Sequence, residues 1–279
     1  MNNLHPIALR PETEPEHPLT YRQEIASPLF QRLRAGESGV IIGAASMGKS
    51  RLLQFIQRRD VQRHYLAAMA ESTLLIAADC NRLAAFSAWA LHELLLTALI
   101  EASGEYEQTR DLSERHYQWR NEAIRSRSRL LTQRHVELAL HIFCKERGLR
   151  IGFILDEFDE AYRRLPSQAL ANLRALRDQH KYQLSYLLFT RDDPKYLRNP
   201  DQCEGFYELI SRGVNGLSPY GEEDGRRVIQ QICARRYHEV GHLEESILRA
   251  LLQLSGGHPG LIAALLDAHY QQTHWHHLA

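Results

Sequence analysis

The sequence predicts an α/β fold in which a parallel sheet of five strands is covered by helices and is followed by a smaller helical part. A strand, a glycine-rich loop and a helix occupy residues 39–56. Short apolar runs then alternate with helical segments as far as residue 217, the pattern of parallel strands joined by crossover helices. Beyond residue 220 only helical patterns follow. We therefore expect a flexible arm (1–19), a core domain (20–218) and a helical lid (219–279).

The glycine-rich loop has the form G-x-x-x-x-G-K-[ST], which is typical of phosphate-binding loops. Its glycines allow the backbone N–H groups to surround a polyphosphate at the positive end of the following helix. Lys49 would bridge the β- and γ-phosphates, and the Ser50 hydroxyl would bind Mg²⁺. A chance match in a glycine turn is disfavoured by the buried strand before the loop and the helix after it. The expected nucleotide-binding residues are Gly43, Ala44, Ala45, Ser46, Met47, Gly48, Lys49, Ser50 and Arg51.

The composition is that of a reduced, water-soluble protein. Thirty-four basic and thirty-four acidic residues leave a formal net charge of zero, so no overall field favours nucleic acid or a membrane surface. The four cysteines are far apart and form no C-x-x-C pair, which favours a reducing compartment. No apolar run is long enough to be a signal sequence or a membrane span. We expect a cytoplasmic protein without membrane contact.

The remaining elements follow from apolar periodicity. Residues 114–150 predict one long helix or two, with an excess of basic residues. Two interpretations of this stretch stay open, a solvated helix face, which we favour, and a surface for a polyanion or a protein partner. Residues 103–113 predict a polar loop. Strands are expected at 73–80, 151–155, 184–189 and 213–217, and helices at 20–35, 84–102, 165–179, 203–211, 222–238, 243–254 and 259–272.

A second group of polar residues follows the strand at 151–155. Asp156 would lie at the end of this strand beside the Mg²⁺ ion, and Glu157 would polarise a water molecule for attack on the γ-phosphate. An acidic pair before a helix can also be only a helix cap. Together with the phosphate loop, the pair favours catalysis. Asp159 and Glu160 are expected to cap the helix or to face solvent.

Two further sites come from the ends of other elements. Thr190 and Arg191 end the strand at 184–189, at the sheet edge where ligands of open α/β sheets collect, and we expect them to sense the γ-phosphate. The alternative is an ordinary surface arginine. Arg212, just before the last strand, is a candidate to reach the nucleotide of a neighbouring subunit, and a role as a surface charge is equally compatible with its position.

These motifs resemble those of P-loop ATPases of the ASCE class that join an AAA+-type core to a helical lid. The resemblance covers about residues 20–270 and is nearest to STAND ATPases and origin-recognition ATPases. It rests on three motifs and on the lid sequence Gly-Gly-His-Pro-Gly at 256–260. The resemblance implies strand order 5-1-4-3-2, ATP as the nucleotide and contacts to it from His258 and Pro259. The motifs are 43–50 (Walker A), 153–157 (Walker B) and 190–191 (sensor one).

Two departures from the family pattern limit the functional prediction. The lid has no arginine at 256–261, where AAA+ proteins carry their second sensor, and the chain stops at Ala279 without room for a winged helix. We therefore expect either that the sensor or effector is on another polypeptide or that the protein works as a minimal switch. Three functions stay open. They are an ATP-driven switch that engages a protein partner or self-assembles, an ATPase that assembles on duplex DNA, and a nucleotide-binding module with negligible turnover.

Overall fold

The computed structural model describes residues 17–126, 128–237 and 243–276. Its centre is a sheet of five parallel strands in the order β2-β3-β4-β1-β5, which confirms the predicted order read from the opposite edge. Because all strands are parallel, their C-terminal ends lie along one edge, where Ile42 pairs with Thr190 and Asp79 with Asp156. The strands are β1 (Gly39–Ile42), β2 (Thr73–Asp79), β3 (Arg150–Asp156), β4 (Leu184–Thr190) and β5 (Val214–Gly216).

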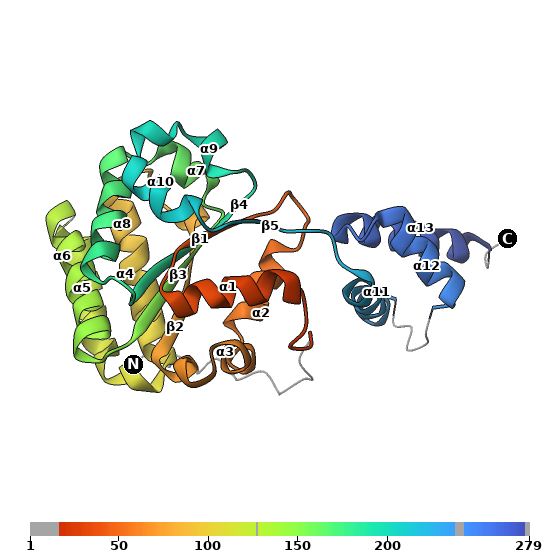
Figure 1. Cartoon of the computed structure of the whole chain (residues 1–279), viewed down its shortest axis with the longest axis horizontal. Helices are drawn as coiled ribbons and strands as arrows, with labels where there is room; N and C mark the ends of the chain where they lie inside the picture. The colour runs from red at the N-terminus through yellow and green to blue at the C-terminus, as the bar shows by residue number, and fades with distance from the viewer. Residues whose placement is uncertain (1–16, 127, 238–242, 277–279) are drawn as a thin grey trace.

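Helices cover both faces of this sheet, as a parallel sheet requires (Figure 1). One core packs Val40, Leu155 and Leu188 of the strands against four helices. The second core packs Ile41 and Phe189 against three N-terminal helices. The first set is α4 (Ala88–Glu105), α6 (Arg129–His141), α8 (Ser167–Gln179) and α10 (Glu204–Ser211), and the second is α1 (Gln23–Ala35), α2 (Lys49–Gln57) and α3 (Arg59–Leu66).

The stretch from 103 to 150 differs in detail from the prediction. The basic region is divided into α5 (Ser113–Ser126), α6 and a π-helical turn at Ile142–Glu146. Ser128 makes the break, because its Oγ accepts a hydrogen bond from the N–H of Leu131 and so caps α6. The predicted polar loop at 103–113 is wrong, because residues 103–105 belong to α4 and Glu107–Leu112 form a 3₁₀ helix. The Thr109 hydroxyl, which donates to the carbonyls of Ser103 and Tyr106, stabilises that turn.

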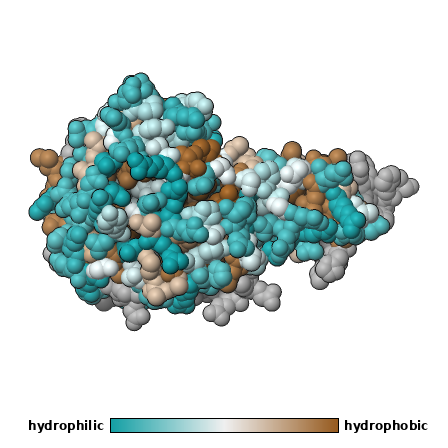
Figure 2. Space-filling model, viewed as in Figure 1, coloured by the Kyte–Doolittle hydropathy of each residue, from teal (hydrophilic) through white to brown (hydrophobic). Residues whose placement is uncertain are grey.

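The C-terminal part is a bundle of three helices, which extends to one side of the core (Figure 1). These are α11 (Glu222–Arg236), α12 (Glu245–Ser255) and α13 (Pro259–His276). The second core continues into them through Val228, Ile262 and Leu266. The face shown in Figure 2 is mainly hydrophilic and narrows between the core and this bundle. Among the described residues, no helix is both long enough and apolar enough to span a membrane.

The remaining elements are short connections between the larger ones. Two small α-helices follow the sheet edge after β3 and β4, and 3₁₀ turns link several other segments. The helices are α7 (Asp159–Arg164) and α9 (Pro194–Leu197), and the turns outside 107–112 are Ala67–Ser72, Cys80–Arg82 and Pro200–Gln202.

Candidate nucleotide-binding site

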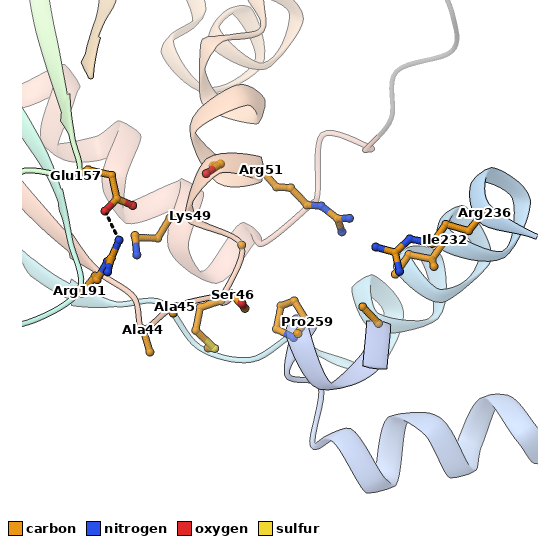
Figure 3. A pocket seen from close by; sticks show the side chains of 15 residues that line it. Ala44, Ala45, Ser46, Lys49, Arg51, Glu157, Arg191, Ile232, Arg236 and Pro259 are labelled. Atoms are coloured by element: carbon orange, nitrogen blue, oxygen red, sulfur yellow. Dashed lines mark hydrogen bonds and ion pairs between the residues drawn. The ribbon is translucent and has the colours of Figure 1, made fainter. Parts of the chain in front are cut away.

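A cavity of about 380 Å³ lies between the C-terminal edge of the sheet and the C-terminal helices (Figure 3). Residues 44–51 of the phosphate loop line one wall, together with Glu157 and Arg191. The opposite wall belongs to α11 and α13. Its residues are Ile232, Arg236, Pro259, Gly260 and Ala263. This volume is in the range of small-molecule sites, and the cavity is bounded by both parts of the chain.

The phosphate loop has the backbone geometry that its glycines predict. Gly48 has φ 88°, and a Cβ there would lie 3.1 Å from the Tyr220 hydroxyl oxygen. Gly43 lies at the base of the loop, where its N–H donates to the carbonyl of Thr190 (2.9 Å). Its own carbonyl accepts a hydrogen bond from Lys49 Nζ (2.7 Å). Lys49 is therefore held at the N-terminus of α2, with 7% of its surface exposed.

Asp156 and Ser50 offer the oxygen atoms that a magnesium ion prefers. Ser50 lines the cavity, and Asp156 pairs in register with Asp79 at the ends of β3 and β2. Burial raises the pKa of Asp156, and the charges of Glu157 and Asp79 raise it further. A cation beside these carboxylates would offset that repulsion, so the residues present fit a divalent metal. The described residues contain no cluster of three or more His, Cys, Asp or Glu side chains that would hold one without the nucleotide.

Glu157 and Arg191 are joined by an ion pair at the phosphate-loop end of the cavity (Figure 3). Arg191 Nη2 lies 2.8 Å from Glu157 Oε2. Glu157 has φ 48°, a conformation that is uncommon and strained for a residue other than glycine. Such strain is often found at functional sites. The proposed catalytic carboxylate is thus held in a specific orientation and is paired with the proposed sensor.

Asp159 has a different role from the one that the sequence predicted. It is buried, and its carboxylate accepts hydrogen bonds from the backbone N–H groups of Arg191 (2.9 Å) and Asp192 (3.3 Å). The expectation that Asp159 caps the helix or faces solvent is therefore wrong. Its carboxylate fixes the loop that follows β4, and this loop carries Arg191. Charge-assisted bonds of this kind are stronger than neutral ones.

Thr190 lies next to the cavity and does not line it. Its side chain is fully buried, and its Oγ1 has no hydrogen-bond partner among the described residues. Buried hydroxyls are rarely left without a partner in proteins. Thr190 ends β4 beside Ile42, the last residue before the phosphate loop. An unpaired donor at this position is available to a ligand or a water molecule at the sheet edge.

Two other predicted residues lie outside the cavity. His258 turns its ring to α13, where Nδ1 accepts hydrogen bonds from the N–H groups of Gly260 (3.1 Å) and Leu261 (3.3 Å). It thus caps the helix whose first residue, Pro259, does line the cavity. Arg212 precedes β5 at the opposite edge of the sheet, since Val214 pairs with Val40 near the start of β1. Its side chain is 83% exposed.

Sequence reasoning missed Arg22, which joins the phosphate loop to the lid. Arg22 is fully buried, with φ 47°. Its guanidinium donates to the carbonyls of Met47 in the loop (2.8 Å) and Ser218 in the linker (2.6 Å). It also lies 4.1 Å from the ring centre of Tyr220, within the range of a cation–π contact. The contact to Ser218 spans 196 positions and the one to Met47 spans 25, so no local pattern reveals them.

Sequence reasoning also missed Arg236 and Ile232 of α11. These two residues are one helical turn apart and both face the cavity (Figure 3). The signal available in the sequence was their spacing of four, which places two side chains on the same face of a helix. Nothing local indicated that this face meets the phosphate loop.

Comparison with solved structures places this arrangement among known folds. No family model matches the chain, and no curated protein matches it. The Aeropyrum pernix ORC1 protein in complex with DNA aligns over 90% of this chain and 60% of its own, with 14% identity and a TM-score of 0.53. The ADP form of the Aeropyrum pernix ORC2 protein aligns over 95% and 67%, with 17% identity and a TM-score of 0.55. The Walker-type ATPase PABY2304 of Pyrococcus abyssi aligns over 88% and 68%, with 16% identity and a TM-score of 0.52.

Because their identities are low, these likenesses establish the fold alone. The chain spans 60% of the length of the ORC1 protein and about two thirds of the other two. The ORC1 and ORC2 alignments cover 90% and 95% of this chain, so they include most of its five-stranded sheet and of its C-terminal helices. The chain therefore has the fold of the archaeal ORC and Cdc6 proteins, with a five-stranded parallel sheet followed by a helical part.

Proposed function

We propose that this chain is a Mg²⁺-dependent ATPase that works as a nucleotide-driven switch. The observation that carries the proposal is that one cavity is lined both by the phosphate loop and by the C-terminal helices. A nucleotide in this cavity contacts the core and the lid (219–279) together. The bound nucleotide therefore stabilises the lid position in which both contacts are made, and hydrolysis of the nucleotide removes this stabilisation.

Each residue at the phosphate end has a proposed role. Lys49 leaves the carbonyl of Gly43 and binds the β- and γ-phosphates. Glu157 orients and deprotonates the attacking water, and Arg191 and Thr190 sense the γ-phosphate. A magnesium ion held by Ser50 and Asp156 would neutralise charge on the phosphates. The γ-phosphate competes with Glu157 for Arg191, so ATP itself would release the carboxylate that acts on it.

The nucleoside is proposed to be adenosine. Ile232, Ala263 and Pro259 offer an apolar wall on the lid side of the cavity. No Asn-Lys-x-Asp motif, the usual reader of guanine, occurs in the sequence. The switch would act on a protein partner or on further copies of this chain.

Two variants test the proposal. Lys49→Ala should abolish ATP binding, because the phosphates lose their main charge partner, and titration calorimetry measures this directly. Glu157→Gln should keep ATP affinity and lower the turnover rate by about 100-fold or more, since a positioned base contributes that much. ATP binding by Lys49→Ala at wild-type affinity would refute the site. Turnover that is absent from the wild-type protein would leave only a nucleotide-binding module.

A second candidate function is an ATPase that assembles on duplex DNA. It is favoured by one fold neighbour, the ORC1 protein, whose structure was solved in complex with DNA. Within this chain, α5 exposes Tyr117, which is 55% accessible, and carries Arg120 and Arg125. Filter binding with duplex DNA tests this function. ATP-dependent binding that weakens steeply with salt would favour it, and salt-insensitive or absent binding would exclude it.

A further inference from the structure

The cavity has two arginines in addition to the cations at its phosphate-loop end. Four cationic side chains line it, and Glu157 is the only carboxylate among the described lining residues. Lys49 and Arg191 lie at the end that holds Glu157 (Figure 3). The remaining pair, Arg51 and Arg236, point toward one another from α2 and α11 at the other end. Two guanidinium groups that face each other repel unless an anion lies between them.

Arg236 is already paired with an exposed carboxylate of the lid. Its Nη1 lies 3.0 and 3.1 Å from the two carboxylate oxygens of Asp267 on α13. The two side chains are 53% and 45% exposed, and ion pairs that face water to this degree contribute little. Asp267 also accepts a hydrogen bond from the Tyr237 hydroxyl, so the carboxylate keeps a partner when Arg236 leaves. Exchange of Asp267 for a phosphate group is therefore favourable for Arg236.

The position of the pair along the nucleotide follows from the motif. Lys49 and Glu157 mark the β- and γ-phosphate end, so the opposite end of the cavity receives the α-phosphate and the nucleoside. Ile232 and Ala263, the apolar lining residues of the lid, lie on the same wall as Arg236. Arg236 is also the only cation that the described part of the lid contributes to this cavity, since the other lid residues that line it are uncharged.

We propose that Arg236 binds the α-phosphate of the nucleotide together with Arg51, and that Asp267 holds it when the site is empty. This inference rests on the proposed function. In consequence, the lid closes on ADP as well as on ATP, because both carry the α-phosphate. Arg236 thus responds to either nucleotide, whereas the residues around Glu157 respond only to a nucleotide with a γ-phosphate.

Titration calorimetry on the full chain tests the assignment with ADP and with a non-hydrolysable ATP analogue. Arg236→Ala should weaken both by the same factor, about tenfold, which equals about 1.4 kcal/mol. Arg235→Ala is the matched control, because it removes the same charge from the same helix and Arg235 is not among the described lining residues. It should bind both nucleotides as the wild type does. Circular dichroism melting of both variants checks that the lid remains folded.

Asp267→Asn tests the exchange itself. It keeps the shape of the side chain and an acceptor for Tyr237, and it releases Arg236. Affinity for both nucleotides should rise by about twofold. A fall in affinity would overturn the holding role of Asp267.

The possible failures are distinguishable. If Arg236→Ala weakens only the ATP analogue, or changes neither affinity, the α-phosphate assignment is wrong while the proposed function stands. If the wild-type protein binds neither nucleotide, or Lys49→Ala binds as well as the wild type, the proposed function itself fails.

Discussion

Glu157 is held by its neighbours more than by its ion pair. Its positive φ costs about 1–3 kcal/mol, whereas an ion pair to an exposed arginine contributes at most about 1 kcal/mol. The strain is supported instead by Phe158, which is fully buried and whose N–H donates to the carbonyl of Phe189 (3.1 Å). The N–H of Glu157 donates to Asp156 Oδ1 (3.0 Å). The backbone at Glu157 is therefore fixed in place, and the pairing of its carboxylate with Arg191 is easily exchanged.

His92 makes stability depend on pH. It is 1% exposed in α4, and its Nε2 has no hydrogen-bond partner among the described residues. Burial lowers the pKa of His92 to about 4, against an opposing effect of Glu137. The folded protein keeps this histidine neutral, whereas the unfolded chain protonates near pH 6.5. Above pH 6.5 the titration of His92 should thus not lower the free energy of unfolding. Between pH 6.5 and pH 4 this free energy should fall by up to about 1.4 kcal/mol per pH unit as the pH decreases.

Urea unfolding at several pH values measures this dependence. Burial also lowers the pKa values of His135 and His180, which add to the wild-type slope. His92→Phe removes one titrating group and should flatten the curve between pH 6.5 and 4. Parallel curves for the variant and the wild type would mean that His92 is protonated in the folded state.

At the scale of the elements, the turn between α12 and α13 determines how the lid meets the phosphate loop. Gly257 has φ 76°, and a Cβ there would overlap the carbonyl oxygen of Tyr220. The carbonyl of Gly257 accepts a hydrogen bond from the N–H of Tyr220 (2.9 Å). Tyr220 in turn shares a hydrogen bond with Tyr21 (2.9 Å), beside the loop. The position of α13 therefore depends on the absence of a side chain at residue 257.

Neighbouring glycines provide a matched test. Gly256 has φ 55°, and no atom lies within 4 Å of the place that a Cβ would occupy, so Gly256→Ala should lose only about 1–2 kcal/mol for the left-handed conformation. Gly257→Ala carries the same strain and in addition displaces Tyr220. It should lose clearly more free energy of unfolding and should weaken ATP binding. Urea unfolding measures both losses. Equal losses for the two variants would show that a Cβ at residue 257 is accommodated beside Tyr220 without a shift of the lid.

The elements differ in how far the sequence predicts them. The central strands were predicted well because a parallel sheet buries both of their faces, so each is a mostly apolar run, as in β4, whose seven residues are all buried. The edge strand β5 is an exception, because its Val214 and Gly216 are exposed. Helix α3 was not predicted, because its exposed face is polar and few of its residues are apolar. The phosphate loop was predicted because its glycines are needed locally. Arg22 and Arg236 were not, because long-range packing brings them to the site.

On the scale of the whole molecule, the two ends of the parallel strands carry different candidate residues. The cavity lies at the C-terminal edge of the sheet, and Arg212 lies at the N-terminal edge. There its carbonyl accepts a hydrogen bond from Arg32 (2.6 Å), while its side chain faces solvent. Strand β5 and the loop beyond it separate Arg212 from the cavity of its own chain. Any direct effect of this arginine on hydrolysis must therefore act on the nucleotide of another copy.

Variants that are inactive for different reasons test this arrangement. Arg212→Ala should bind ATP normally and should hydrolyse it about 100-fold more slowly, since an arginine supplied by a neighbour stabilises charge on the transferred phosphate. Lys49→Ala should not bind ATP and still carries Arg212. Mixing the two should restore turnover, because each Arg212→Ala site then meets an intact arginine from a Lys49→Ala neighbour. Arg134→Ala, which removes a 66% exposed arginine of α6, is the control and should keep full activity. If Arg212→Ala matches the wild type, Arg212 is a surface charge; if it is slow and mixing restores nothing, the arginine acts through the fold of its own subunit.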